Sequence, residues 1–273
     1  GKLSLDSKIN EFFPNFAQPE IDGKLIGAPG HDILDIGHLL RHDSGFIASP
    51  KYHDNTVLTN LGQQESGVDY NYLYTQDESE ILDKLLSTPL EFEPGTVVRY
   101  SDVDFMLLGK IVELVSELPL DEFLDEYIYG PLGINNVMFN PLDKGIDARK
   151  IAATELNGNT RGGRVIFWNP RTEVLQGTVH DEKAWHSFAG VAGHAGLFGN
   201  ANDIAKLASL MLNNGTANGI QIFDKQTIEA FSQPAPLNDT YGYGWRRQGN
   251  SKGYGWAFSD HASVNTLGHT GWT

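Results

Sequence analysis

The sequence predicts an α+β fold in which helices predominate and strands are few and short. Apolar residues recur at helical spacing in several segments, whereas the alternation typical of strands is confined to brief stretches. The chain has 273 residues, 40% of them hydrophobic, without an internal repeat or a clean linker. We therefore expect one continuous core and no independent second domain. Residues 1–260 should be mainly helical, and residues 261–273 should begin a strand of a sheet.

Helices are expected where an apolar face is bounded by residues that cap or stop a helix. The strongest pattern covers 102–117, where Ser101 or Asp102 is a suitable N-cap. The other expected helices cover 32–43, 77–87, 120–129, 203–212 and 224–231.

Strand signals are weaker. Short strands are expected near 165–168 and 174–179, and the loosely alternating segment 263–270 is expected to form another. The polar, turn-rich segment 47–75 is long for a loop, and loops of that length are often functional.

Composition excludes several classes of function. The formal net charge of −15 repels nucleic acid and anionic lipid, so no nucleic-acid partner is expected. The absence of cysteine rules out thiolate metal sites and cysteine nucleophiles. His38 and His42 have the spacing of helical metal ligands, but leucines between them mark a core-facing stripe, so both are interpreted as structural or surface residues. We expect no metal and no cofactor.

The first candidate catalytic group is Tyr100, directly before the expected helix at 102–117. A tyrosine before an N-cap lies on a rigid loop tip, where its phenol can point into a cleft. The positive potential of the helix N-terminus favours a tyrosinate, and a phenol with a depressed pKa can act as general base for a hydroxyl nucleophile. The alternative is a half-buried core tyrosine with a hydrogen-bonded hydroxyl.

Two further segments have the composition of a site wall. In Gly268–Trp272, small polar residues on a strand edge would let a substrate approach, and His269 and Thr270 could hold a carboxylate or carbonyl. An ordinary strand-to-turn segment is the alternative. In 190–196, glycine and alanine surround His194, which indicates either a site wall or two closely packed layers.

In this order, the motifs resemble those of the serine β-lactamase and penicillin-binding protein superfamily, in its class C and esterase-like branch. His38–Gly45 is similar to the family's Leu-Leu-x-His-x-Ser-Gly signature, Pro94–Asp102 to its Pro-Gly…Tyr-x-Asn motif, and His269–Gly271 to its Lys-Thr-Gly strand. Residues 151–160 and 179–184 resemble periplasmic D-Ala-D-Ala carboxypeptidases of this superfamily.

The resemblance implies a β-lactamase/transpeptidase-like fold truncated at both ends, with the nucleophile helix and most of the antiparallel sheet outside these residues. It also implies a catalytic role for Tyr100, which would deprotonate the nucleophile and protonate the leaving group, and for His269. Asp102 would contact the substrate amide and the catalytic lysine, and the backbone N–H of Trp272 would supply half of the oxyanion hole. The substrate-binding candidates are Asp102, Thr270, Gly271, Trp272 and His194.

The chain departs from the family pattern at three points. Asp102 stands where asparagine is usual, and a Lys–Asp pair would keep the lysine protonated. His269 stands where lysine is usual and carries less positive charge at neutral pH, which predicts weaker carboxylate binding. No serine is followed three residues later by lysine, so the family's Ser-x-x-Lys nucleophile is absent and this chain alone should be inactive.

The expected function is therefore serine-type D-Ala-D-Ala carboxypeptidase activity on peptidoglycan stem peptides, through an acyl-enzyme. An esterase or weak β-lactamase of the same fold, acting on esters or β-lactams, is one alternative. A non-catalytic protein that binds peptidoglycan peptides is another. The resemblance implies export to the periplasm or cell envelope, although no signal lies in this chain, and it leaves membrane association of the parent protein open.

Overall fold

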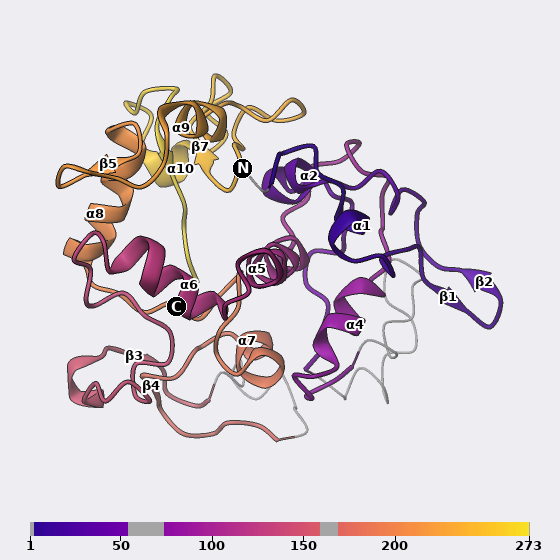
Figure 1. Cartoon of the computed structure of the whole chain (residues 1–273), viewed down its shortest axis with the longest axis horizontal. Coiled ribbons are helices and arrows are strands. Elements are labelled where there is room, and N and C mark those ends of the chain that lie inside the picture. Colours follow the sequence, from indigo (N-terminus) through magenta and orange to yellow (C-terminus); the bar gives the residue numbers. More distant parts are fainter. Residues whose placement is uncertain (1–2, 54–73, 159–168, 273) are drawn as a thin grey trace.

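The computed structural model describes residues 3–53, 74–158 and 169–272 (Figure 1). Helix α5 (Asp102–Ser116) lies at the centre, between the N-terminal helices on one side and the C-terminal elements on the other. Strands in the described residues pair only as two-stranded antiparallel ribbons, β1-β2, β3-β4, β5-β6 and β7-β8. The fold is therefore helix-rich with small sheets, as the sequence predicts.

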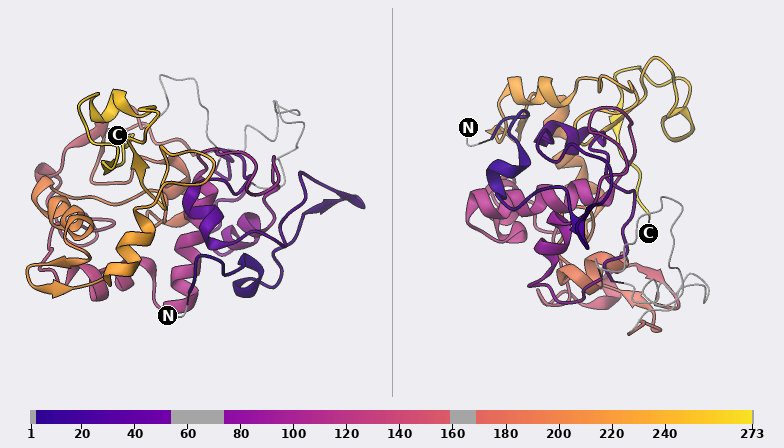
Figure 2. Two further views of the ribbon diagram at one scale, coloured as in Figure 1. Left: turned by 90° about the horizontal axis from the view of Figure 1, so that it is seen from above. Right: turned by 90° about the vertical axis from the view of Figure 1, so that its right-hand side faces the viewer.

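The N-terminal side contains α1 (Ile9–Phe12), α2 (Ile36–Arg41) and α4 (Ile81–Leu86). The side chain of Asp35 caps α2 by accepting a hydrogen bond from the backbone N–H of His38. Ribbon β1 (Glu20–Ile21) and β2 (Lys24–Leu25) projects from the body of the molecule (Figures 1 and 2).

Helix α5 begins at a well-formed cap and buries one face in the main core. The Ser101 side chain accepts a hydrogen bond from the N–H of Val103. Met106, Leu107 and Ile111 are almost fully buried, and the helix packs against α2, α4 and α6. The glycine-rich segment 190–196 lies against this helix, because a Cβ on Gly193 would come 2.0 Å from the carbonyl oxygen of Phe105. Close packing of layers thus explains part of this glycine content.

The middle of the chain contains short elements: α6 (Leu120–Leu124), the π-helical turn η2 (Asp125–Tyr129), the 3₁₀ turn η3 (Ala148–Lys150), β3 (Ala153–Glu155), β4 (Leu175–Gln176) and α7 (Glu182–Phe188). The C-terminal part contains α8 (Ala201–Leu212), β5 (Thr216–Ala217), β6 (Ile220–Gln221), α9 (Lys225–Phe231), β7 (Arg246–Arg247), α10 (Gly255–Phe258) and β8 (Leu267–Gly268). In the last ribbon, Arg246 pairs with Gly268 and Arg247 with Leu267.

Several expected elements are shorter in the structure. The helix predicted over 32–43 covers only Ile36–Arg41, because Asp35 caps it, and Ile33 outside it is exposed. The strand predicted near 174–179 is reduced to Leu175–Gln176, and the one over 263–270 to Leu267–Gly268. The strand predicted near 165–168 lies outside the described residues. Across the described ranges, none of the helices is long and apolar enough to traverse a lipid bilayer.

Candidate active site

The N-terminus of α5 places Tyr100 and Asp102 on one side of the central helix. Ser101 between them is fully buried, and its hydroxyl donates a 2.6 Å hydrogen bond to the carbonyl of Ile47. The backbone N–H of Asp102 donates to the carbonyl of Ala48 at 3.1 Å. The cap therefore ties the start of the helix to the 47–49 segment and fixes the directions of the two flanking side chains.

Tyr100 lies among basic and aromatic groups that are distant in sequence. Its ring centroid is 4.4 Å from that of His42 and 5.9 Å from that of His269, and the guanidinium carbon of Arg246 is 5.3 Å from it. The side chain is only partly covered, with 37% of its surface exposed. The fold thus brings together Tyr100 and His269, the two residues that the sequence nominates for catalysis.

The phenol of Tyr100 is not acidified in this arrangement. Burial and the nearby Asp102 carboxylate raise its pKa to about 12, although Arg246 acts in the opposite direction. The expectation of a depressed pKa from the helix N-terminus is therefore not met. At neutral pH Tyr100 is a proton donor, and it would become a base only if a further cation lay beside it.

His42, whose ring lies against Tyr100, forms a buried pair with Asp104. The distance between His42 Nδ1 and Asp104 Oδ2 is 2.7 Å. Burial raises the pKa of Asp104 to about 6, against the hydrogen bond from His42. The structural interpretation of His42 is confirmed, since it is 4% exposed. Asp104 was not among the residues predicted from the sequence, and its one signal is its place within an apolar helical run.

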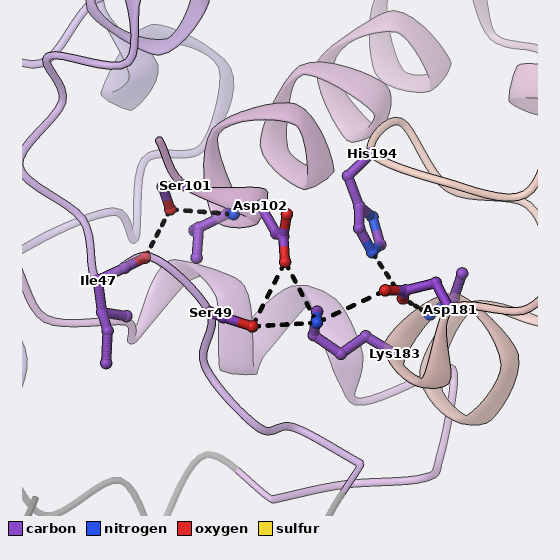
Figure 3. Close-up of polar contacts among 9 residues, drawn as sticks. Ile47, Ser49, Ser101, Asp102, Asp181, Lys183 and His194 are labelled. Atoms are coloured by element: carbon purple, nitrogen blue, oxygen red, sulfur yellow. Dashed lines mark hydrogen bonds and ion pairs between the residues drawn. The ribbon is translucent and has the colours of Figure 1, made fainter. Parts of the chain in front are cut away.

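Asp102 contacts a lysine that the sequence analysis did not single out. The ammonium of Lys183, on α7, is 3.2 Å from Asp102 Oδ2 and 3.6 Å from Asp181 Oδ2 (Figure 3). It also donates to the hydroxyl of Ser49 at 3.2 Å. Burial alone would lower the pKa of Lys183, but the neighbouring carboxylates outweigh it and raise the pKa. From the sequence we expected Asp102 to keep the family's catalytic lysine protonated. In the structure Asp102 has this effect on Lys183.

His194 contacts this cluster through Asp181. Its Nε2 lies 3.1 Å from Asp181 Oδ1, and its side chain is only 2% exposed. The Asp181 carboxylate also caps α7 by accepting from the N–H of Ala184 at 2.8 Å. Burial opposes ionisation of Asp181, but His194 and Lys183 lower its pKa well below the usual range. Any influence of His194 on a substrate would pass through Asp181 and Lys183.

In the segment after β8, residues 269–272 differ in their contacts and in their exposure to solvent. Burial lowers the pKa of His269, so that the imidazole is mostly neutral at pH 7. The Thr270 hydroxyl is 2.9 Å from the hydroxyl of Tyr254. Gly271 has open space where a Cβ would be, and the side chain of Trp272 is 88% exposed. His269 therefore faces Tyr100, whereas the Trp272 side chain points into solvent.

The described residues offer no cluster of three or more histidine or acidic side chains that could hold a metal ion. A pocket of about 890 Å³ lies between α8, the end of α9 and the β7-β8 ribbon. Arg247 lines it, whereas the preceding residue, Arg246, faces Tyr100. Successive residues of a strand point to opposite faces, so the pocket and the Tyr100 site are separate.

The chain matches known proteins along its whole length. The family model described as Beta-lactamase matches residues 1–273. An Escherichia coli (strain K12) protein named "Putative D-alanyl-D-alanine carboxypeptidase" is 45% identical over 273 residues, which are 100% of this chain and 59% of that protein. The chain thus spans about three-fifths of the length of the curated relatives it matches.

Solved structures agree with this assignment at the level of the fold. A penicillin-binding protein homologue from Caulobacter crescentus superposes with a TM-score of 0.61 at 16% identity, over 100% of this chain and 66% of that one. EstCE1, described as a hydrolase with promiscuous acyltransferase activity, gives 0.61 at 21% identity, over 97% and 67%. The resemblance and the β-lactamase-like fold expected from the sequence motifs are confirmed, and the chain belongs to the β-lactamase family.

Proposed function

We propose that this chain is the helix-rich part of a serine hydrolase that cleaves peptidoglycan stem peptides ending in D-Ala-D-Ala. The observation that carries the proposal is the 5.9 Å approach of the Tyr100 and His269 rings, which stand far apart in the sequence. The name of the Escherichia coli relative supports the same substrate class.

In this proposal the reaction passes through an acyl-enzyme. A serine hydroxyl outside these 273 residues attacks the penultimate D-Ala carbonyl, and water then releases the acyl group. Tyr100 exchanges the proton with the nucleophile and the leaving amine, for which its protonated state suits the donating step. Asp102 orients the substrate amide, and the N–H of Trp272 contributes to an oxyanion hole.

Ser49 is the one described serine in contact with Lys183, at 3.2 Å. A serine–lysine pair can generate a nucleophile only when the lysine is a free amine. The carboxylates around Lys183 raise its pKa and keep it an ammonium, so it cannot accept the proton of Ser49. We therefore assign the nucleophile elsewhere.

A second candidate function is ester hydrolysis on the same site. It is favoured by the neutral imidazole of His269, since a neutral group attracts a substrate carboxylate less than an ammonium would. EstCE1 has a similar fold, although the identity of 21% limits that likeness to the fold. A protein that binds stem peptides without cleaving them is the remaining alternative.

Fluorescent penicillin followed by intact-mass analysis tests the proposal. We expect an adduct on the full-length product of the gene and none on the 273-residue chain. Tyr100→Phe in the full-length protein should slow acylation by at least about 100-fold. Tyr127→Phe is the matched control, because Tyr127 is 51% exposed on η2.

Other outcomes lead to different conclusions. An adduct on the 273-residue chain would overturn the placement of the nucleophile, and peptide mapping should then begin with Ser49. No adduct on either protein, together with hydrolysis of p-nitrophenyl esters, would favour the esterase. Binding of a D-Ala-D-Ala peptide without any turnover would favour the non-catalytic alternative.

We further propose that the protein acts in the cell envelope, where peptidoglycan is found. Its relatives' carboxypeptidase name supports this location. Fractionation of cells that produce the full-length protein should recover it with periplasmic markers, and recovery in the cytosol would contradict the proposal.

A further inference from the structure

Lys183 joins three segments of the chain at the start of α5. Its ammonium lies 3.2 Å from Asp102 Oδ2 on α5, 3.6 Å from Asp181 Oδ2 and 3.2 Å from the hydroxyl of Ser49 (Figure 3). An ammonium carries three N–H donors, one for each of these partners. The Lys183 side chain is only 5% exposed, so it can act on a substrate only through a neighbouring residue.

The position of this ammonium is fixed from the side of α7. One oxygen of Asp181, Oδ1, accepts from the backbone N–H of Ala184 at 2.8 Å and lies 3.1 Å from Nε2 of His194. The other oxygen, Oδ2, faces Lys183. A helix cap and a buried histidine therefore hold the carboxylate that holds the ammonium.

The contacts of Asp102 converge on one oxygen of its carboxylate. Lys183 and the hydroxyl of Ser49, at 3.5 Å, both approach Oδ2 (Figure 3). Within the described ranges, Oδ1 takes part in no hydrogen bond or ion pair. The Asp102 side chain keeps 19% of its surface exposed. A ligand can therefore contact this carboxylate without displacing Lys183.

An aspartate at this position differs from the usual asparagine in hydrogen bonding as well as in charge. The amide of asparagine both donates and accepts, whereas an ionised carboxylate only accepts. A carboxylate that a substrate covers also loses water, which costs free energy unless a cation compensates its charge. Lys183 supplies that cation for Asp102, and Oδ1 is left as the acceptor.

We propose that Lys183 is a positioning residue, which holds Asp102 as the acceptor for the N–H of the substrate's N-acyl amide. This role rests on the proposed function, in which Asp102 orients the substrate amide. It adds a substrate specificity to that function. The site should prefer acyl groups whose amide nitrogen carries a hydrogen, because the carboxylate has no donor to offer and the donors of Lys183 are already used.

A purely structural role is the competing explanation. Lys183 would then only tie α7 to the start of α5, and its loss would impair every substrate alike. A positioning role instead predicts a loss that depends on the substrate N–H and on the charge of residue 102. The two roles therefore differ in two measurable ways.

The first test compares two thioesters in the full-length protein, an N-acetyl-D-alanyl thioester and its analogue methylated at the amide nitrogen. In the wild type, kcat/KM should be about 10- to 100-fold higher for the N–H substrate, since methylation removes one charge-assisted hydrogen bond. Lys183→Met should lower kcat/KM for the N–H substrate by about 10-fold or more and leave the methylated substrate nearly unchanged.

Three outcomes of this test would overturn the proposal. An equal loss on both thioesters in Lys183→Met would assign a structural role to Lys183. An unchanged preference for the N–H substrate in this variant would show that Asp102 does not depend on the ammonium. Equal hydrolysis of both thioesters by the wild type would show that the substrate N–H is not recognised.

The second test asks whether Lys183 matters only while residue 102 is charged. The side chain introduced by Asp102→Asn needs no counter-ion, and its carbonyl oxygen can still accept the substrate N–H. Asp102→Asn with Lys183→Met should therefore show the same N–H preference as Asp102→Asn alone, and a lower preference would contradict the proposal. This comparison also decides the matter if Lys183→Met does not fold, because the double variant leaves one carboxylate fewer unpaired.

Lys225→Met is the charge-matched control. Lys225 pairs with Glu229 on α9, and its side chain is 64% exposed. Its replacement changes the net charge equally but should leave the preference between the two thioesters unaltered. A preference that is lost in this control as well would indicate a general effect of net charge and overturn the assignment to Lys183.

Failure of the proposed function gives a different result. If the wild-type protein hydrolyses neither thioester, the catalytic proposal fails, and binding decides the question for Lys183. Calorimetry would then compare N-acetyl-D-Ala-D-Ala with its analogue methylated at the acetamide nitrogen. A wild-type preference for the N–H peptide that disappears in Lys183→Met would support the positioning role. No such preference, or one that persists in the variant, would overturn it.

Discussion

Two basic side chains, those of Lys183 and Arg246, lie near the N-terminus of α5. Carboxylates pair with the first, whereas aromatic rings surround the second. Lys183 is 4% exposed and lies between Asp102 and Asp181, with Ser49 as a third partner (Figure 3). Arg246 is half-buried among tyrosine rings, and no carboxylate of the described residues pairs with it. Both side chains lie beside the residues proposed to bind substrate.

This difference determines whether the charge of each side chain is already neutralised by other residues of the chain. A buried ammonium must have its hydrogen bonds and charge satisfied, and for Lys183 other side chains of this chain do so. Its cluster can position Asp102, but it offers no charge to a ligand. Aromatic faces stabilise the guanidinium of Arg246 while leaving N–H donors available. The two cations therefore differ in how their charges are satisfied, by carboxylates for Lys183 and by aromatic faces for Arg246.

The largest effect is expected from removing the paired cation. Lys183→Met should lower the free energy of unfolding by about 3–5 kcal/mol, because Asp102 and Asp181 would lose their shared counter-ion. Urea denaturation of the 273-residue chain measures this. Lys110→Met is the control, since Lys110 forms a partly exposed pair with Glu113 on α5 and should cost about 0.5 kcal/mol. Similar losses in both variants would remove the contrast on which the comparison rests.

A smaller effect is expected from restoring the family's usual residue next to Lys183. If Lys183 neutralises Asp102, then Asp102→Asn should recover about 1–2 kcal/mol of unfolding free energy in the Lys183→Met background. The recovery should be incomplete, because Asp181 stays charged beside the missing ammonium. A double-mutant cycle by urea denaturation gives the coupling. Strictly additive losses would show that the 3.2 Å contact carries no energetic coupling.

The pH dependence of stability should reflect the histidine on the same helix as Lys183. Burial, with a contribution from Arg171, lowers the pKa of His186 to about 4, from 6.5 in the unfolded chain. The unfolded state therefore binds more protons between these values, so the free energy of unfolding should fall as the pH drops from 6.5 to 4. His186→Gln should make this fall shallower.

His261→Gln serves as the control for that titration, because His261 is exposed. Asp104, whose pKa is raised to about 6, contributes the opposite slope above its unfolded value, but it does so in all three proteins. Urea denaturation at several pH values isolates the difference. If the slopes of His186→Gln and wild type coincide, His186 is not held neutral by the fold.

Some features around Lys183 and Arg246 could be predicted from the sequence, and others could not. The helix at 102–117 and its Ser101 cap follow from local periodicity and capping, and the structure has α5 at Asp102–Ser116. The motifs around Tyr100 and His269 are also found from short segments. Their mutual approach depends on tertiary packing, so the motifs indicate it only through the resemblance.

Lys183 and Arg246 could not be predicted from the sequence, for a physical reason. Lys183 follows two acidic residues on a short helix, where a solvated charge cluster is the ordinary interpretation. Arg246 stands next to Arg247, and nothing local shows that one faces Tyr100 and the other the pocket. The role of each depends on contacts made by segments more than 50 residues away, such as that of Lys183 with Asp102.

The smallest stability effect is expected from the cation without an acidic partner. Arg246→Met should lower the free energy of unfolding by about 1 kcal/mol, because only contacts with tyrosine faces are lost and the methionine can refill part of that space. A loss in urea denaturation as large as that of Lys183→Met would mean that Arg246 is a structural element like Lys183. The two cations would then differ only in the chemistry of their partners, carboxylates for Lys183 and tyrosine rings for Arg246.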